Sequence, residues 1–327
     1  RTAGIWGAVA VANVDGDIYT EAITGRDHVY IHIYDQDGQP MPNFPLRTPE
    51  KHSDINNQWG TFRYGEFTRG AAAIGDIDQD GILEIAMPGD VRDPAASHAK
   101  NNNGLWVIEP DGDRQLGFES APMAGPSLTG DFKPMYSASL GDLNHDGIME
   151  IVVPFASGEI RVYRANGSLY WKYDYAQGKM LYPSEVAIGD VSGDGFPDVV
   201  FGTYSPTGSN KADVRLIALS GLTGQMLPDF PLTLSKEGGD KQGIRAAPTL
   251  TDIDKDCDVD IIVASWGGTV YGWDLSAPYY WDRMPWPTGR HDIERTGAMT
   301  GPSAVGSLAC PLPKPLVPGM YLPMVNR

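Results

Sequence analysis

Short apolar runs of strand length alternate with glycine-rich polar turns along most of the chain. Examples are EIVV from Glu150 and DVVF from Asp198, both rich in β-branched residues. Runs of this kind are typical of strands, because a helix needs a longer segment with a period of about 3.6 residues. The pattern therefore predicts an all-β fold without long helices.

One arrangement of these runs occurs five times: small and β-branched residues, an acidic loop, and a second apolar run. A further alternating strand follows in most copies, for example GEIRVYRANG from Gly158. Each copy therefore predicts a unit of four strands. The five loop segments are VANVDGDIYTEAI from Val11, IGDIDQDGILEIAM from Ile74, LGDLNHDGIMEIVV from Leu140, IGDVSGDGFPDVVF from Ile188 and LTDIDKDCDVDIIV from Leu250.

A four-stranded antiparallel unit cannot bury both of its faces alone, so it must stack on its neighbours. Radial stacking predicts a β-propeller of about five four-stranded blades over residues 1–301, with the acidic loops between the first and second strands. A parallel βαβ array is the alternative, but the chain lacks the amphipathic helices it requires. Residues 302–327 are proline-rich and nearly uncharged, which predicts an extended tail outside the repeat.

The acidic loops follow the pattern D-x-[DNS]-x-D-x-x-x-[DE]. Alternate carboxylates around a turn, with a backbone carbonyl between them, supply the hard oxygen ligands that calcium prefers, whereas magnesium demands a smaller octahedron. Turn formation alone could explain one such loop, but not a carboxylate at the ninth place of all five. The candidate calcium ligands are Asn13, Asp15, Asp17 and Glu21; Asp76, Asp78, Asp80 and Glu84; Asp142, Asn144, Asp146 and Glu150; Asp190, Ser192, Asp194 and Asp198; and Asp252, Asp254, Asp256 and Asp260.

The charge balance fits this interpretation. The chain has 42 acidic and 25 basic residues, a formal charge of −17, which argues against nucleic acid or an anionic membrane as a partner. No apolar stretch is long enough to span a bilayer, and the opening RTAGIWG is not a signal peptide, so any export signal is expected outside this sequence. Much of the acidity lies in the five loops, which predicts up to five bound calcium ions.

Because an apolar β run follows the ligands, where an EF-hand has a helix, the loops resemble those of the FG-GAP or VCBS repeat family, whose best-known member domain is the integrin α-subunit propeller. The resemblance extends to about Gly301, and the segment PWPTGRHDIERTG from Pro285 is similar to one near the ends of bacterial proteins with these repeats. It implies an extracellular or cell-surface calcium-binding propeller. The family usually has seven blades, so five is a departure.

Four loop positions also depart from the family pattern. The first loop has Asn13 for aspartate and Ile18 where glycine is expected, the fourth has Ser192 at the third position, and the fifth has Cys257 at the glycine position. These loops are expected to be weaker sites.

The expected function is that of a secreted or cell-surface binding or structural module, including a role as a subunit of an extracellular polymer. Its partner would be a protein or a carbohydrate. The alternative is a carbohydrate-active enzyme resembling a polysaccharide lyase. The chain contains no H-E-x-x-H, G-x-S-x-G, P-loop or dinucleotide motif, so no catalytic residue and no organic cofactor is predicted.

The longest irregular segments are expected on the face opposite the acidic loops, at residues 48–69, 89–104, 204–213 and 235–243. Trp59, Arg63 and Tyr64 in the first segment suit a sugar ring or a protein partner, although such residues also pack between blades. Cys257 and Cys310 can form a disulfide bond that pins the tail to the last blade, or can remain two free thiols.

Overall fold

The computed structural model describes residues 7–26, 29–47, 64–67, 70–93, 99–119, 123–124, 136–234, 243–292 and 294–299. Within these ranges the chain is all-β, which confirms the prediction from the short apolar runs. The helices in these ranges are two 3-10 helices of three residues each, η2 (Lys211–Asp213) and η3 (Trp281–Arg283).

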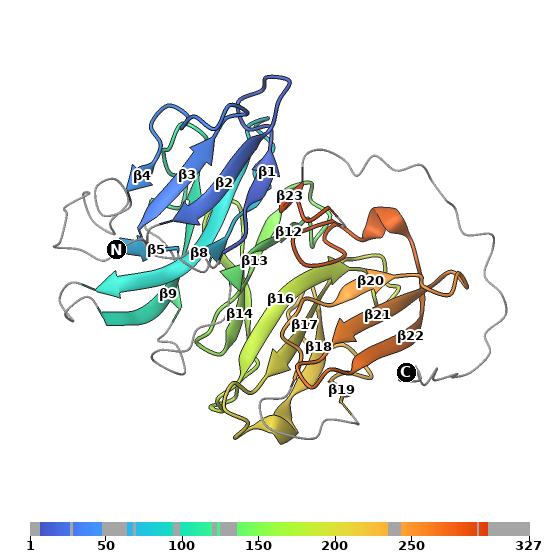
Figure 1. Cartoon of the computed structure of the whole chain (residues 1–327). Helices are drawn as coiled ribbons and strands as arrows, with labels where there is room; N and C mark the ends of the chain where they lie inside the picture. Colours follow the sequence, from blue (N-terminus) through green and yellow to red (C-terminus); the bar gives the residue numbers. More distant parts are fainter. Residues whose placement is uncertain are drawn as a thin grey trace.

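The strands form five successive antiparallel sheets, which we number in chain order (Figure 1). The first, third and fourth sheets have four strands each, in sequential order. Their strands are β1 (Ala10–Ala12), β2 (Glu21–Arg26), β3 (Tyr30–Tyr34) and β4 (Leu46–Arg47); β12 (Ser139–Gly141), β13 (Glu150–Pro154), β14 (Glu159–Tyr163) and β15 (Leu169–Asp174); and β16 (Tyr182–Gly189), β17 (Asp198–Tyr204), β18 (Arg215–Ser220) and β19 (Leu232–Thr233).

The second sheet has extra strands. It consists of β7 (Ala73–Gly75), β8 (Glu84–Asp93), β9 (Ala99–Ile108) and β10 (Met123–Ala124), with β23 (Ala298–Met299) pairing in parallel with β7 and β5 (Tyr64–Glu66) pairing with β8. Two short strands, β6 (Gly70–Ala71) and β11 (Tyr136–Ser137), pair in parallel beside it.

The fifth sheet departs from the four-strand prediction, because its described part contains only β20 (Thr249–Thr251), β21 (Asp258–Ala264) and β22 (Val270–Pro278). After β22 the chain enters the helix η3, and the described residues up to 299 do not add a fourth strand to this sheet. The prediction of an irregular segment at residues 89–104 is also wrong. Strands β8 and β9 run through most of it, because β5 and β9 provide partners on both sides of the outer half of β8.

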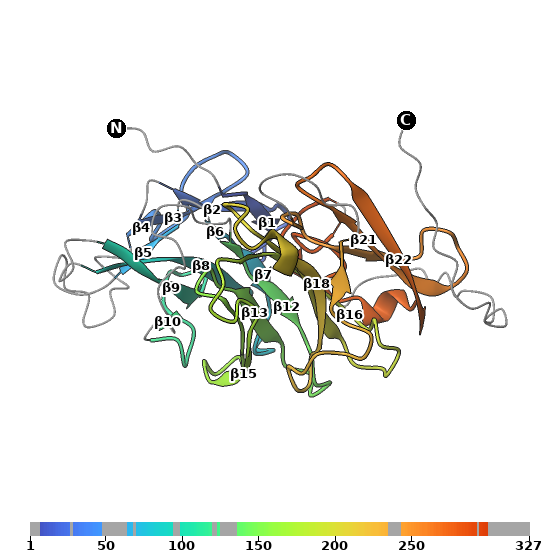
Figure 2. The same cartoon turned by 90° about the horizontal axis from the view of Figure 1, so that it is seen from below.

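The five sheets stack on one another through their first strands. Contacts join β1 to β7, β7 to β12, β12 to β16 and β16 to β20 (Figures 1 and 2). Every residue of β13 and of β17 is buried, since neighbouring sheets cover both faces of these strands. One apolar core joins the second, third and fourth sheets through residues such as Ala86, Leu140 and Ile188, and two further cores join the remaining neighbours.

A segment after the last sheet, residues 285–292 and 294–299, runs along the first strands of four sheets. We call it the linking segment. Its carbonyls at Trp286, Pro287, Thr296 and Gly297 accept backbone hydrogen bonds from β16, β20, β1 and β7, at 2.7, 2.8, 2.8 and 2.9 Å. It therefore connects the last two sheets to the first two, which the chain order places far apart.

Candidate metal sites

The five acidic loops occupy equivalent places in the five sheets. Each loop joins the first strand of a sheet to the second, as predicted, and we number the loops like the sheets. In four sheets the carboxylate at the ninth place is the first residue of the second strand, and in the fifth it is the third residue of β21. The hairpin therefore fixes the closing carboxylate, while the other acidic residues follow the turn.

The closing carboxylates are buried and held by the same hydrogen bond in every loop. They are between 0% and 5% exposed. Each accepts the backbone N–H of the residue seven positions earlier: Val14 N–H to Glu21 at 2.8 Å, Ile77 N–H to Glu84 at 2.6 Å, Leu143 N–H to Glu150 at 2.9 Å, Val191 N–H to Asp198 at 3.1 Å and Ile253 N–H to Asp260 at 2.7 Å.

Several of these buried carboxylates keep a second oxygen that accepts no hydrogen bond from the described residues. These atoms are Oε1 of Glu21, Oε1 of Glu84 and Oδ1 of Asp198, together with Oδ1 of Asp76 at the first place of the second loop. A buried carboxylate oxygen without a partner is costly, because burial removes its hydration. A cation between the loop residues would satisfy these oxygens, so the residues present fit a metal ion.

The protonation of the closing carboxylates reflects the same crowding. Burial, together with the negative charges of Glu109, Asp78 and Asp80, raises the pKa of Glu84 to about 8. Burial likewise raises the pKa of Glu150 and Asp198 to about 7 and that of Asp260 to about 6, with other acidic residues of their loops adding to each shift. A bound divalent cation would reverse this trend, since it favours the charged carboxylate.

Three loops already bring carboxylates into ligand geometry. Oxygen atoms lie within 4.8 Å of one another in the first, second and fifth loops, whereas the described residues of the third and fourth loops give no such group. The fifth sheet holds a second group beside its loop. The three-carboxylate groups are Asp15, Asp17 and Glu21; Asp76, Asp78 and Glu84; Asp252, Asp254 and Asp260; and Asp256, Asp258 and Asp274.

The departures from the family pattern have simple structural consequences. Cys257 has a φ of 79°, close to the value of 91° for Gly81 at the equivalent place, so the fifth loop keeps the left-handed turn without glycine. The first loop keeps the left-handed residue at the fourth place, Gly16 at 80°, as the second loop does with Gln79 at 63°. At the sixth place Ile18 does not have a positive φ, and its side chain is 87% exposed. The fifth loop therefore retains both left-handed positions, whereas the first retains one.

Some charged residues outside the loops also contact them, and the loop pattern did not reveal them. Glu109 follows β9 and interacts electrostatically with Asp78, Asp80 and Glu84 of the second loop. Arg283 of η3 donates a hydrogen bond from Nη1 to the buried Asp190 Oδ2 at 3.0 Å. The position of Glu109 just after a strand opposite Glu84 could have indicated it, but no local pattern in the sequence connects Arg283 with Asp190.

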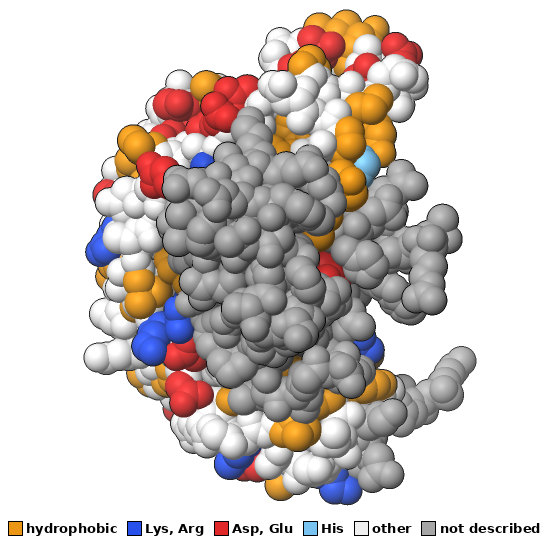
Figure 3. Space-filling model, turned by 90° about the vertical axis from the view of Figure 1, so that its left-hand side faces the viewer, with side chains coloured by type: hydrophobic (Ala, Val, Ile, Leu, Met, Phe, Trp, Pro, Cys, Tyr) orange, Lys and Arg blue, Asp and Glu red, His pale blue; other side chains and the backbone are white. Residues whose placement is uncertain are grey.

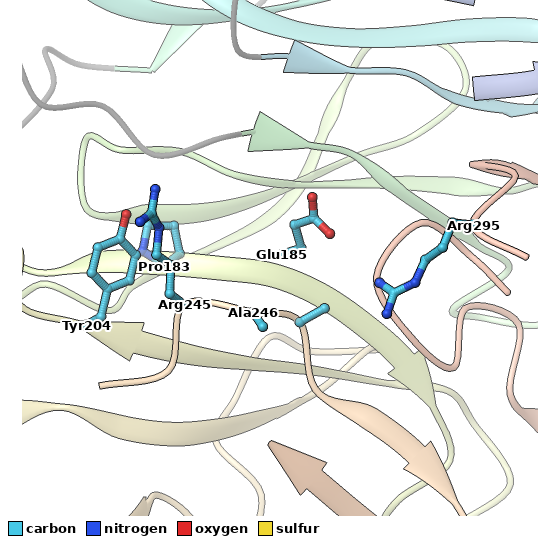
Figure 4. Close-up of a pocket in the computed structure, with 7 residues that line it drawn as sticks. Pro183, Glu185, Tyr204, Arg245, Ala246 and Arg295 are labelled. Atoms are coloured by element: carbon cyan, nitrogen blue, oxygen red, sulfur yellow. The ribbon is translucent and has the colours of Figure 1, made fainter. Parts of the chain in front are cut away.

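A different candidate site lies at the start of β16, away from the fourth loop (Figure 4). It is a pocket of about 210 Å³. Burial raises the pKa of Glu185, and the charges of Arg290 and Arg295 oppose that shift. Arg245 lies over the ring of Trp266, 5.3 Å from its centroid. The pocket is lined by Pro183, Glu185, Tyr204, Arg245, Ala246, Ala247 and Arg295.

This pocket contains two guanidinium groups, although the chain as a whole is acidic. On the side of the molecule in Figure 3, the largest group of charged side chains is acidic. Two arginines line the pocket, Arg245 and Arg295, on either side of the carboxylate of Glu185 (Figure 4). Guanidinium groups offer planar donor pairs that match a carboxylate or a phosphate, so an anionic group in the pocket would meet these donors beside the carboxylate of Glu185.

Most of the remaining predicted site residues lie outside the part of the chain that the structure describes. Trp59, Arg63 and Cys310 lie outside the described residues, as do residues 302–327. Tyr64 begins β5, where it pairs with Arg92 of β8. Cys257 is disulfide-bonded, and the described residues include no free cysteine. Its pairing with Cys310 stays a prediction.

A comparison with protein-family models gives no match, and a comparison with curated proteins gives none. Solved structures do match. The biofilm matrix protein Bap1 of V. cholerae is 15% identical, with a TM-score of 0.35, over 83% of this chain and 53% of that one. The rhamnogalacturonan lyase PL11 of Bacillus licheniformis is 14% identical, with a TM-score of 0.41, over 83% and 57%. BamB from Moraxella catarrhalis is 14% identical, with a TM-score of 0.37, over 85% and 61%.

This chain thus spans a little over half the length of each of these three structures. Among the residues that the structure describes, no helix is long and apolar enough to cross a membrane.

Proposed function

We propose that this protein is a calcium-binding β-propeller that acts outside the cell or at its surface as a binding or structural module. The observation that carries the proposal is the closing carboxylate of the loops. Glu21, Glu84 and Asp198 are each at most 1% exposed, yet each keeps a buried oxygen that no described residue contacts by a hydrogen bond. Three repeats of this feature at one place in the fold favour a bound cation.

The ligand chemistry favours calcium among the available cations. The loops offer carboxylate, amide and hydroxyl oxygens and backbone carbonyls, all hard ligands, and none of the ligand positions holds a histidine or a cysteine. Calcium tolerates the irregular geometry of such a loop better than magnesium does. Its millimolar concentration outside cells would fill even weak sites, which supports an extracellular setting.

A propeller arrangement is supported by how the sheets meet. Neighbouring sheets contact each other through their first strands in chain order. The linking segment then hydrogen-bonds to the first strands of the fifth, fourth, first and second sheets, so it bridges the gap between the two ends of the series. On this proposal the five sheets are the blades, and calcium stiffens the loops at one end of each.

The proposal is tested by calcium titration of metal-stripped protein with isothermal calorimetry, and by melting experiments with and without chelator. We expect binding of several ions, with magnesium much weaker at equal concentration. Each site at about 100 times its dissociation constant adds about 2.7 kcal/mol to the free energy of unfolding. Unchanged melting temperature and protease resistance after removal of calcium would rule the proposal out.

A lyase-like activity on an acidic polysaccharide is the second candidate, and the pocket beside Glu185 favours it. Arg245 and Arg295 could hold the carboxylate of a sugar acid there. The test is incubation with acidic and with neutral polysaccharides, followed by the ultraviolet absorbance of new unsaturated sugar ends. Activity on an acidic polymer that Arg245→Gln abolishes would support this function, and no new ends on any polymer would exclude it.

A further inference from the structure

The five loops share one pattern but differ at the position across the hairpin from the closing carboxylate. This position lies on the third strand or directly after it. Backbone pairing places Asp274 opposite Asp260 in the fifth sheet. In the fourth sheet Ser220 pairs with Asp198 directly, and in the first three sheets the position lies one residue beyond the last strand pair. The five residues are Asp35, Glu109, Arg164, Ser220 and Asp274.

The second loop has an acidic residue at this position and unsatisfied oxygens beside it. Oε1 of Glu84 and Oε2 of Glu109 are both buried and accept no hydrogen bond from described residues, and Glu84 is 0% exposed. The buried side chain of Gln115 donates from Nε2 to Asp78 Oδ2 at 2.6 Å, which fixes a third carboxylate of the same loop. Buried oxygens without a hydrogen bond from described residues therefore come from Glu84 at the start of β8, from Glu109 just after β9 and from Asp76 in the turn.

The third loop has the opposite arrangement. Both oxygens of Glu150 already accept hydrogen bonds, from Leu143 N–H at 2.9 Å and from Asn144 Nδ2 at 3.1 Å. The residue across the hairpin is Arg164, whose positive charge interacts with Glu150. In the third loop, hydrogen-bond donors and the guanidinium of Arg164 therefore satisfy Glu150. In the second loop, buried carboxylate oxygens accept no hydrogen bond from described residues.

We infer that the residue across the hairpin grades the metal sites: Glu109 makes the second loop a tight calcium site, and Arg164 makes the third loop a weak one. The inference rests on the proposed calcium binding. Calcium affinity in loops of this kind follows the number of ligand charges. The second loop gathers five carboxylates, as the fifth does with Asp274, whereas the third has three carboxylates and one guanidinium.

The first experiment removes the added carboxylate. Glu109→Gln keeps the shape of the side chain, and its matched control is Asp111→Asn, which removes the same charge from the exposed turn two residues later. In calcium titrations followed by calorimetry, Glu109→Gln is expected to weaken the second-loop site, the binding step that Glu84→Gln removes, about tenfold or more. Asp111→Asn should change it less than about twofold.

The second experiment removes the cation of the third loop. Arg164→Gln is expected to strengthen the third-loop site, the binding step that Glu150→Gln removes, several-fold. Its control is Lys172→Gln, which removes a charge from the same sheet where Lys172 contacts Glu159. Arg164 also lies over the ring of Tyr170. Melting in chelator therefore has to show that each variant folds. Glu84→Gln and Glu150→Gln assign the binding steps to the second and third loops.

The outcomes separate the two proposals. Several calcium ions bound by the wild type, with Glu109→Gln indistinguishable from Asp111→Asn, would overturn the grading and leave calcium binding intact. The same holds if Arg164→Gln does not strengthen the third-loop site. No calcium bound by the wild type would overturn both.

Discussion

At the scale of single residues, a buried loop carboxylate has opposite effects on stability with and without a bound metal ion. Glu84 is fully buried. Without a metal ion its carboxylate faces the acidic residues Asp76, Asp78, Asp80 and Glu109, and with one it would bind the ion that they share. Without metal, burial and the neighbouring charges raise its pKa to about 8, so at neutral pH the folded state must bind a proton that the unfolded chain has released, which lowers stability. With metal, the same charge is a ligand. A substitution here should therefore have opposite effects in the two states.

Glu84→Gln is expected to stabilise the metal-stripped protein by about 1 kcal/mol near pH 8, because the neutral amide removes the cost of protonating or ionising a buried carboxyl group. In calcium it should destabilise the protein by about 2 to 3 kcal/mol, because one bound ion is lost. Urea unfolding with calcium and with chelator measures both values.

The control for this reversal is Glu159→Gln. Burial opposes the charge of Glu159, but hydrogen bonds from Lys172 and Arg161 hold the pKa of its carboxyl below the usual value. Its substitution should destabilise the protein slightly in both conditions. The assignment of Glu84 as a ligand would be contradicted if the effect of Glu84→Gln on the free energy of unfolding had the same sign in calcium and in chelator. It would also be contradicted if the effect of Glu159→Gln changed sign between the two conditions.

The sequence predicted the loop residues well and their outside partners poorly. The alternating acidic pattern locates Asp76, Asp78 and Glu84, because one turn places them and the turn is local. Glu109 joins them only through the register of β8 with β9. Arg283 reaches Asp190 from 93 positions away, and that contact depends on how the last sheet packs against the fourth.

Among the elements, the linking segment has the largest structural role for its length. Trp286 is 0% exposed, and its backbone bonds in both directions with Ile188 of β16. Further along, Gly297 lies against Ala10 and Ala72, and its φ of 70° suits glycine. The segment therefore packs as an internal strand although it pairs for only a few residues at a time.

Trp286→Ala is expected to lower the free energy of unfolding by about 3 to 5 kcal/mol, because it leaves a large cavity between the fourth sheet and the linking segment. Trp281→Ala is the matched control, since Trp281 lies in η3 five residues earlier and is 41% exposed. Its substitution should cost less than about 1 kcal/mol. Chemical denaturation in saturating calcium compares the two, and equal losses would mean that the linking segment does not tie the sheets together.

The strands themselves were predictable wherever apolar residues alternate or run together between turns. The prediction failed at residues 89–104, where β8 and β9 continue through the polar sequence around Asn101 to Asn103. Pairing with β5 and β9 supplies hydrogen bonds there that the apolar pattern does not signal. It failed also for the fourth strand of the fifth sheet, because the chain leaves that sheet through η3.

At the scale of the whole molecule, the loops repeat the same electrostatic conflict in every sheet. The formal charge of −17 is concentrated at one end of each hairpin, where the closing carboxylates are buried. The number of repeats and their order along the chain could be predicted from the sequence. How the two ends of the series meet could not, because the linking segment has no periodic pattern and its partners are distant in sequence.

This repeated conflict predicts how the stability of the metal-stripped protein depends on pH. The folded-state pKa is about 8 for Glu84 and about 7 for Glu150 and Asp198, all above the usual value for an unfolded chain. Between about pH 4.5 and about pH 8 the folded state therefore holds more protons than the unfolded state, so stability falls as pH rises. Calcium replaces those protons, and its stabilising effect should grow over the same range.

The measurement is the melting temperature of metal-stripped protein, in buffer treated with a chelating resin, at about pH 5 and about pH 8, with a parallel series in millimolar calcium. We expect a drop of at least about 5 °C in the stripped series, since each kcal/mol corresponds to a few degrees in a chain of this size. The calcium series should stay level or rise. If the stripped protein were instead more stable at the higher pH, the closing carboxylates would have to be ionised and satisfied without metal, and the loops would be ordinary turns.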